Sequence, residues 1–124
     1  MMNKYRDKSD FEINCQVLET FEPDIKHMCL SNDERSFYHC GFDGNGFYET
    51  TIPDYCNNPA DAMPIVIENR ISIESRFNGH YDEWYASLQT NKILIDATGT
   101  NYYRAAMEVF LMMKEAENEN NNNS

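Results

Sequence analysis

The stretch that most constrains the fold is Arg104-Ala105-Ala106-Met107-Glu108-Val109-Phe110-Leu111-Met112-Met113. Its apolar residues recur at helical spacing, so we predict a helix over about residues 101–116, the longest in the chain. The apolar stripe is broad and is formed by Ala105, Ala106, Val109, Phe110, Met112 and Met113. A stripe of this width has to be buried, and we expect it to pack on a sheet.

A first helix is predicted near the N-terminus. Ser9-Asp10-Phe11-Glu12 fits a capping box, in which the serine hydroxyl meets an orphan N–H and the glutamate reaches back. Pro23 ends this helix. The residues expected on its apolar face are Phe11, Cys15 and Leu18, flanked by Val17 and Phe21.

The start of a second helix depends on Pro64. With Asp61 as the N-cap, Pro64 stands at the third helical position, where its missing N–H would be an orphan anyway. With Asn58 as the N-cap, Pro64 would remove an interior hydrogen bond. We therefore expect Asp61 to be the N-cap, after at most one tight turn from Asn58, and the helix to end near Arg70. Its buried side is predicted to be Ile65, Val66 and Ile67.

Short strands separate these helices. The turn residues Asp43-Gly44-Asn45-Gly46 predict a hairpin with strands over 36–42 and 47–52. Three further strands are predicted over 71–74, 81–88 and 93–95, with Asn78-Gly79 as a turn between the first two. Residues 24–35 fit no single element.

Short strands followed by a terminal helix indicate the fold class α+β. We expect one domain, a small antiparallel sheet packed with helices in an α/β/α sandwich-like arrangement, over residues 9–116. Residues 1–8 are expected to be a flexible lead-in. Residues 117–124 are expected to be a disordered Asn- and Glu-rich tail, because they contain no apolar residue to bury.

Charge argues against two classes of partner. Of the 124 residues, 21 are Asp or Glu and 10 are Lys or Arg, which gives a net charge of −11. Direct nucleic-acid binding needs basic side chains on the phosphates, and anionic membranes repel an acidic surface.

The longest apolar run, 109–113, is far shorter than the ~20 residues that span a bilayer. No apolar segment follows the basic N-terminus, so we expect a cytoplasmic protein without a signal peptide.

The four cysteines are Cys15, Cys29, Cys40 and Cys56. Without a secretion signal they are expected to be buried thiols. The most metal-like set is His27, Cys29, His39 and Cys40, since zinc takes such ligands in two close pairs. Neighbouring strand residues such as His39 and Cys40 point to opposite faces, which opposes joint ligation. We expect no metal and no cofactor.

No catalytic residue is assigned. Nucleophilic catalysis needs a nucleophile, a base and an orienting group, and none of the three His or four Cys lies in a recognisable local signature. An enzyme using Cys56 or a His is the third and least favoured hypothesis.

Most of the candidate binding residues lie at or just before helix starts. Free backbone N–H groups at the start of the second helix could hold an anion, or its asparagines only cap and turn. Arg104 falls in the first turn of the last helix, where the helix dipole disfavours a cation. This predicts a specific carboxylate partner, with an internal salt bridge favoured over a ligand. Trp84 is either a core residue or a stacking platform. The candidate ligand- or partner-binding residues are Tyr55, Asn57, Asn58, Asp61, Trp84, Asn101 and Arg104.

Three motifs, at 9–14, 54–72 and 104–113, resemble the NinX-like family of tailed phages and prophages of enteric bacteria. Trp84-Tyr85-Ala86 also fits the aromatic-x-Ala of that family's central strand, and the resemblance spans roughly 9–116. The chain departs from the family pattern at Met63, where an aromatic is expected. It departs again at Asn101-Tyr102-Tyr103-Arg104, where Asn-Pro-Leu-Arg is expected. Met63 weakens the hypothesis of an aromatic ligand platform on the second predicted helix.

The resemblance implies a small phage accessory protein in the cytoplasm of an infected bacterium, and it supplies no catalytic residues. An acidic surface also speeds association with basic partners. Our first hypothesis is a non-enzymatic protein that binds a host or phage protein, to counter a defence or adjust replication. The alternative is a small-ligand binder that sequesters a nucleotide or another anionic metabolite. We expect a monomer or homodimer.

Overall fold

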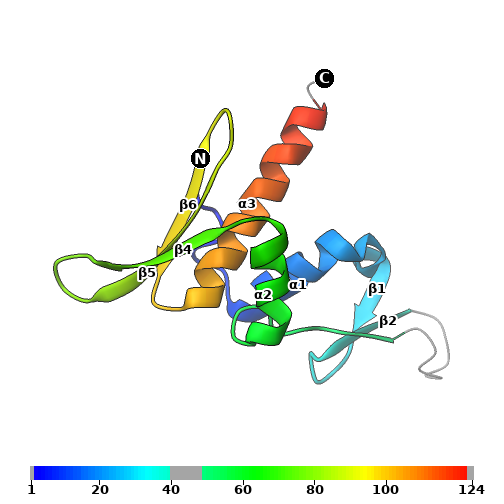
Figure 1. Cartoon of the computed structure of the whole chain (residues 1–124). Coiled ribbons are helices and arrows are strands. Elements are labelled where there is room, and N and C mark those ends of the chain that lie inside the picture. The colour runs from blue at the N-terminus through cyan, green and yellow to red at the C-terminus, as the bar shows by residue number, and fades with distance from the viewer. Residues whose placement is uncertain (1, 40–48, 123–124) are drawn as a thin grey trace.

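A long helix, α3 (Tyr102–Asn122), runs through the middle of the molecule (Figure 1). The computed structural model describes residues 2–39 and 49–122. An antiparallel sheet of β4 (Ser72–Phe77), β5 (Asp82–Gln89) and β6 (Leu94–Gly99) packs on one side of α3. The helices α1 (Asp10–Phe21) and α2 (Pro59–Glu68) pack on its other sides. The layers are therefore the sheet, then α3, then α1 with α2.

A second antiparallel sheet follows α1 and the short 3-10 helix η1 (Pro23–His27). It consists of β1 (Met28–Leu30), β2 (Ser36–His39) and β3 (Glu49–Thr51). Ser36 pairs with Thr51, so the predicted pairing of the hairpin strands is confirmed. The predicted turn at 43–46 lies outside the described residues. Met28, Phe37 and Ile52 attach this sheet to the main core.

The α+β class is confirmed, but the layer order differs from the expected sandwich with helices on both faces of one sheet. The reason lies in α3, where every residue from 105 to 113 is 8% exposed or less. A helix that is apolar on all sides is buried on all sides. The predicted stripe omitted Met107 and Leu111, which complete the apolar circumference and place α3 in the middle layer.

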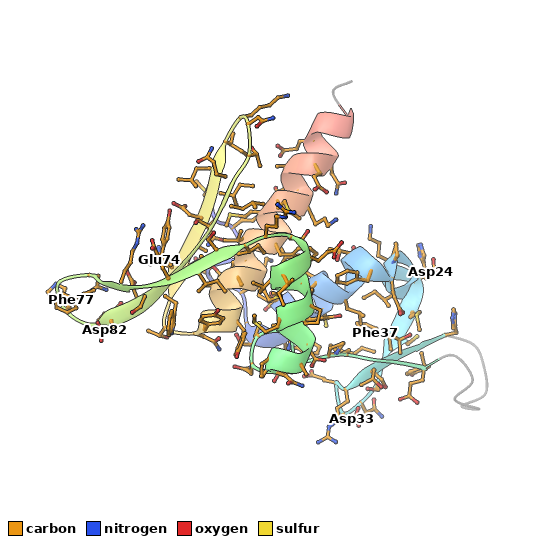
Figure 2. All side chains as sticks on the ribbon, in the orientation of Figure 1. Asp24, Asp33, Phe37, Glu74, Phe77 and Asp82 are labelled. Carbon is orange, nitrogen blue, oxygen red and sulfur yellow. The ribbon has the colours of Figure 1, made fainter. Side chains whose placement is uncertain are left out.

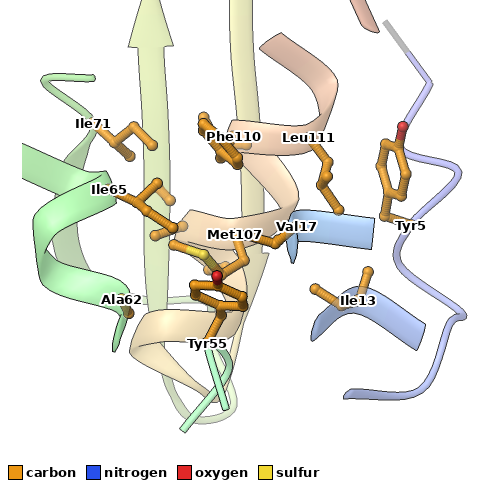
Figure 3. Close-up of a cluster of buried hydrophobic side chains, with 14 of the residues drawn as sticks. Tyr5, Ile13, Val17, Tyr55, Ala62, Ile65, Ile71, Met107, Phe110 and Leu111 are labelled. Atoms are coloured by element: carbon orange, nitrogen blue, oxygen red, sulfur yellow. The ribbon is translucent and has the colours of Figure 1, made fainter. Parts of the chain in front are cut away.

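The core is centred on Met107, Phe110 and Leu111 of α3 (Figure 3). The surrounding buried residues from the other elements include Ile13, Val17, Ala62, Ile65, Ile71, Ala86 and Ile95. Tyr5 is also buried here, and its hydroxyl donates a hydrogen bond to Glu115 of α3 (3.1 Å). Tyr5, in the predicted lead-in, is therefore packed against α3, and the flexibility of residues 1–8 stays a prediction.

α1 begins where the sequence predicts. The Ser9 hydroxyl accepts a hydrogen bond from the Glu12 N–H (3.1 Å) and donates one to the Glu12 carboxylate (3.3 Å). The buried face is turned slightly from the predicted one and consists of Ile13, Asn14, Val17 and Leu18. Phe11 and Cys15, predicted on that face, are half-buried.

The predicted start of α2 is wrong. Asn58 is the N-cap, and its Oδ1 accepts a hydrogen bond from the Ala60 N–H (3.1 Å). Pro59 takes the first helical position, where its fixed φ suits the helix. Pro64 lies inside α2, but both it and Ala60 face solvent, which reduces the cost of the missing hydrogen bond.

Two further boundaries of the predicted helices differ. α2 ends at Glu68, and Ile67, expected on the buried side, is 69% exposed. α3 continues beyond residue 116 to Asn122, and its side chains 117–119 are exposed. A disordered tail in solution stays a prediction.

The turn predicted at Asn78-Gly79 joins β4 to β5. Gly79 has φ +99°, which favours glycine, and the Asn78 side chain accepts hydrogen bonds from the N–H groups of His80 (2.9 Å) and Tyr81 (3.1 Å). The resulting hairpin projects from the side of the molecule, past the first turn of α3 (Figure 1).

Candidate functional site

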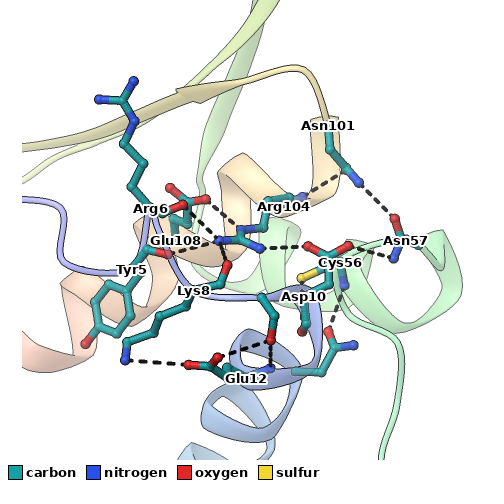
Figure 4. Close-up of polar contacts among 12 residues, drawn as sticks. Tyr5, Arg6, Lys8, Asp10, Glu12, Cys56, Asn57, Asn101, Arg104 and Glu108 are labelled. Atoms are coloured by element: carbon teal, nitrogen blue, oxygen red, sulfur yellow. Dashed lines mark hydrogen bonds and ion pairs between the residues drawn. The ribbon is translucent and has the colours of Figure 1, made fainter.

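The starts of three helices meet at one polar cluster, which we call the helix-start junction (Figure 4). Asn101 caps α3, since its Oδ1 accepts hydrogen bonds from the N–H groups of Tyr103 (2.9 Å) and Arg104 (3.1 Å). Its Nδ2 donates to Oδ1 of Asn57 (2.9 Å), just before α2. Asn57 Nδ2 in turn donates to Oδ2 of Asp10 (3.2 Å), in the first turn of α1. A continuous chain of hydrogen bonds therefore links all three helix starts.

Arg104 is the centre of this junction. Its Nη1 lies 2.7 Å from Asp10 Oδ1 and its Nε lies 2.7 Å from Glu108 Oε2. Its Nη2 donates to the backbone carbonyls of Tyr5 (2.9 Å) and Lys8 (2.6 Å). The internal salt bridge favoured from the sequence is confirmed, and two carboxylates offset the unfavourable position of the cation at a helix start.

The junction keeps Asp10 ionised at neutral pH. Burial by itself would raise the pKa of Asp10, but hydrogen bonds from Arg104 and Asn57 and the charge of Arg104 lower it more, so the pKa falls below its usual range. Burial likewise opposes the charged form of Arg104, while Glu108 and Asp10 raise its pKa overall. The pair is therefore a charged, fully engaged link between α1 and α3.

Cys56 lies beside the junction but is protected. It is fully buried, and its N–H donates to Asn14 Oδ1 (3.0 Å). Burial, with the negative charge of Asp10, raises the pKa of its thiol to about 12. Burial and the neighbouring Glu34 raise the pKa of Cys15 to about 11. Neither thiol forms the nucleophilic thiolate at neutral pH.

The other cysteines differ in state. Cys15 and Cys56 are free, as expected, whereas Cys29 is disulfide-bonded, so the expectation of a thiol is wrong for Cys29. Cys40 lies outside the described residues. Over 2–39 and 49–122, no group of three or more His, Cys, Asp or Glu is placed to hold a metal ion.

The structure brings together only part of the predicted site. Asn57, Asn101 and Arg104 belong to the helix-start junction. Asn58 and Asp61 lie next to it, where Asn58 Nδ2 donates to Asp61 Oδ2 (3.0 Å).

The two predicted aromatic residues lie apart from the junction. Tyr55 is buried in the core (Figure 3), and burial raises its pKa. Trp84 packs edge-to-face on Tyr102, with ring centroids 5.0 Å apart. These seven residues therefore do not form one pocket.

The sequence interpretation missed the acidic partners of the junction. Glu108 stands four residues after Arg104, a spacing at which opposite charges pair on a helix, and this signal was available. Asp10 is 94 positions from Arg104 and carries no local signal for the contact. Asn14 and Asp54, joined by a 3.1 Å hydrogen bond, were missed for the same reason.

A shallow pocket lies between the N-terminal segment and the outer side of the β4–β5–β6 sheet. It has a volume of about 170 Å³ and is lined by Asn3, Arg6, Tyr85, Asp96, Ala97 and Thr98. Sites for drug-sized molecules are typically about 300–1,000 Å³, so this pocket is small for a nucleotide.

The projecting β4–β5 hairpin is the second candidate surface (Figure 2). Its turn region carries two large exposed side chains, Phe77 and Tyr81, which are 69% and 54% exposed. Phe77 pairs with Asp82 across the hairpin, so an acidic group stands beside the exposed ring. This hairpin extends beyond α3, the helix on which the sheet packs (Figure 1).

Together these features define a small acidic α+β protein built around a buried helix, with its polar motifs gathered at helix starts. The family model described as Bacteriophage P22, NinX matches residues 4–114, and the chain belongs to this family. The match includes the whole helix-start junction and the hairpin. The match makes it a phage protein of the NinX family. Comparisons with curated proteins and with solved structures gave no match.

Within the described ranges, no helix is both long and apolar enough to cross a bilayer.

Proposed function

We propose that this phage accessory protein acts by binding a host or phage protein in the bacterial cytoplasm, without catalysis. The observation that carries the proposal is the projecting hairpin, whose Phe77 is 69% exposed beyond the layered core. A projecting element with exposed aromatic side chains is typical of a surface that another protein covers. Countering a host defence and adjusting replication are the roles that fit such binding during infection.

The chemistry of the helix-start junction supports a structural rather than a catalytic role. Each polar side chain of its centre is already engaged: Arg104 by two carboxylates and backbone carbonyls, and Asn101 by Asn57 and two N–H groups. The buried Cys56 thiol is protonated at neutral pH. These groups stabilise the packing of the three helix starts against one another. Contacts with a partner protein are therefore expected on the outer surface.

A small-ligand binder is the second candidate. It rests on the convergence of three helix starts, whose dipoles favour an anion near Asn57. An anion there would replace the Asn101–Asn57 hydrogen bond. Thermal unfolding with a panel of mono- and cyclic nucleotides tests it: a stabilising shift that Asn57→Ala removes supports the ligand function, and no shift rejects it.

Affinity purification from phage-infected host cells tests the protein-binding function. The tagged wild-type chain is expected to recover the same host or phage polypeptide in repeated experiments, above the background of an unrelated acidic protein. Native mass spectrometry of the purified sample then separates the two candidates. A retained polypeptide supports protein binding, and a retained small mass supports the ligand binder. Repeated recovery of bare protein contradicts both.

A further inference from the structure

We propose that the inner face of the β4–β5 hairpin is the docking surface, and that it takes a protein segment in which Arg or Lys stands next to apolar side chains. This inference rests on the proposed protein-binding function and adds its location and the chemistry of the partner. The surface consists of Phe77, Trp84 and Tyr102, edged by Asp82, and is called the aromatic strip below.

Strand register places the aromatic strip on the same face as the core. Residues directly opposite each other in an antiparallel pair share a face, and the pairs are Ile73 with Ala86, Ser75 with Trp84 and Phe77 with Asp82. Ala86 is fully buried under α3, so this is the face that packs on the helix. Phe77 lies four residues beyond Ile73, roughly 13 Å along the strand, where the face leaves the core.

The strip adjoins the core at Trp84 and Tyr102. Trp84 is half-buried, and its ring packs edge-to-face on Tyr102, in the first turn of α3. Tyr102 packs in the same way on Tyr103, with ring centroids 5.0 Å apart. Phe77 and Trp84 are diagonal neighbours across the hairpin, within reach of each other. Trp84 therefore lies between the core and Phe77, which is 69% exposed.

The charge on this face is acidic. Asp82 stands opposite Phe77 and is exposed, and no Lys or Arg side chain of β4 or β5 shares its face. Arg76, the sole Arg or Lys in these two strands, lies on the opposite face. There its guanidinium lies 3.4 Å from the centroid of the Tyr85 ring and donates to Glu74 (2.9 Å). The aromatic strip therefore offers π faces and a carboxylate, with no cation of its own.

A partner with basic and apolar side chains side by side complements this surface. An Arg or Lys can lie over Trp84 or Phe77 as a cation–π contact and pair with Asp82, while a neighbouring apolar side chain covers Phe77. A second copy of this chain is a poorer occupant, because it also carries a net charge of −11 and would bring its own carboxylate to the same place.

Titration of the ¹⁵N-labelled full chain with a synthetic peptide of alternating Arg and Leu tests the proposal. The expected result is that amide signals of 75–84 and the Trp84 indole N–H shift, and that an otherwise equal Glu/Leu peptide causes no shift. Equal binding of both peptides would overturn the basic part of the proposal. Shifts confined to residues outside the strip would overturn its location.

Surface variants decide between specific docking and general attraction to an acidic protein. Phe77→Ser is expected to weaken binding of the Arg/Leu peptide about tenfold, and Asp82→Asn several-fold. The matched controls are Ile67→Ser, at a position equally exposed at 69%, and Asp24→Asn, an exposed acid on η1. Both controls should bind like the wild type. Equal weakening in all four variants would overturn the proposal.

Capture from infected cells separates this inference from the proposed function. If wild type and Phe77→Ser recover the same polypeptide in equal amounts, the aromatic strip is not the docking surface, although protein binding stands. If Phe77→Ser loses the polypeptide and Ile67→Ser keeps it, both stand. If the wild type recovers no polypeptide, the protein-binding function fails. In that case, loss of Arg/Leu peptide binding in Phe77→Ser but not in the control variants would still locate a site for basic segments on the aromatic strip.

Discussion

Asn101 and Asn57, 44 positions apart, are joined by a 2.9 Å hydrogen bond from Nδ2 of the first to Oδ1 of the second. The same Asn101 side chain caps α3 with its other amide atom. One side chain therefore both starts the central helix and fixes where α2 meets it. The N-terminal capping of α3 and the packing of α2 are energetically coupled through this residue.

Replacement of Asn101 tests this double role. Asn101→Ala removes the cap and the link to Asn57, and we expect a loss of about 1–2 kcal/mol in the free energy of unfolding, measured with urea. Asn101→Asp keeps an oxygen that caps α3 but cannot donate to Asn57. It should recover only part of the lost stability, and the remainder measures the link to Asn57. An Asp variant as unstable as the Ala variant would show that the Asn57 link, and not the cap, dominates.

Removal of Arg104 should be more costly. The side chains of Arg104 and Glu108 are only 14% and 6% exposed, so Arg104→Ala leaves a buried carboxylate with Asn3 as its remaining partner. We expect a loss of about 3 kcal/mol in urea unfolding. The control is Arg76→Ala, which breaks an exposed ion pair with Glu74 and should cost less than about 1 kcal/mol. Equal losses in the two variants would contradict the central role of Arg104.

Replacement of Arg70 is expected to stabilise the protein. Arg70 follows the C-cap of α2 with φ +56°, a conformation that costs a side-chain-bearing residue energy and that glycine adopts freely. Arg70→Gly should raise the free energy of unfolding by about 0.5 kcal/mol. Arg70→Ala keeps a Cβ atom and serves as the control, with no gain expected. A gain in both variants would point to the lost charge instead of the backbone.

Deprotonation of Tyr5 should lower the free energy of unfolding at high pH. Burial, with the charge and hydrogen bond of Glu115, raises the pKa of Tyr5 from 10.0 to about 12. The unfolded chain therefore loses this proton near pH 10 and the folded chain only near pH 12. The contribution of Tyr5 to the free energy of unfolding is complete below pH 10 and is lost as the pH rises toward 12. Urea unfolding between pH 9 and pH 12 measures the decline. Tyr5→Phe should show a smaller decline, and an unchanged slope would contradict the assignment.

Local pattern predicted the elements well where a single rule applied. The Ser9 cap, the Asn78-Gly79 turn and the apolar helix over 104–113 each depend on residues close together in the sequence, and all are confirmed. The start of α2 was mispredicted because two rules competed. The favourable cap and first turn that Asn58-Pro59 supplies outweigh the cost of Pro64 inside the helix.

Contacts between distant segments explain what the sequence did not predict. The misplaced charge of Arg104 indicated a carboxylate partner, but nothing local identifies Asp10, 94 positions away. Tyr5 lies in the predicted lead-in, and nothing local indicates that α3 provides the surface that buries it. The exposure of Phe77 depends on where α3 begins relative to the sheet, which strand alternation alone does not reveal.

The central position of α3 has a consequence for synthesis. α1, α2 and both sheets all precede α3 in the chain, and the helices and the β4–β5–β6 sheet bury their apolar faces against it. A growing chain on the ribosome therefore exposes Val17, Ile65 and Ala86 until α3 has been made. Within the described residues, the core of these elements is completed by α3, so we expect stable folding to follow the synthesis of this helix and the unfinished chain to expose apolar surface until then. A chain that ends before residue 102 lacks this helix and is expected not to reach the stable fold.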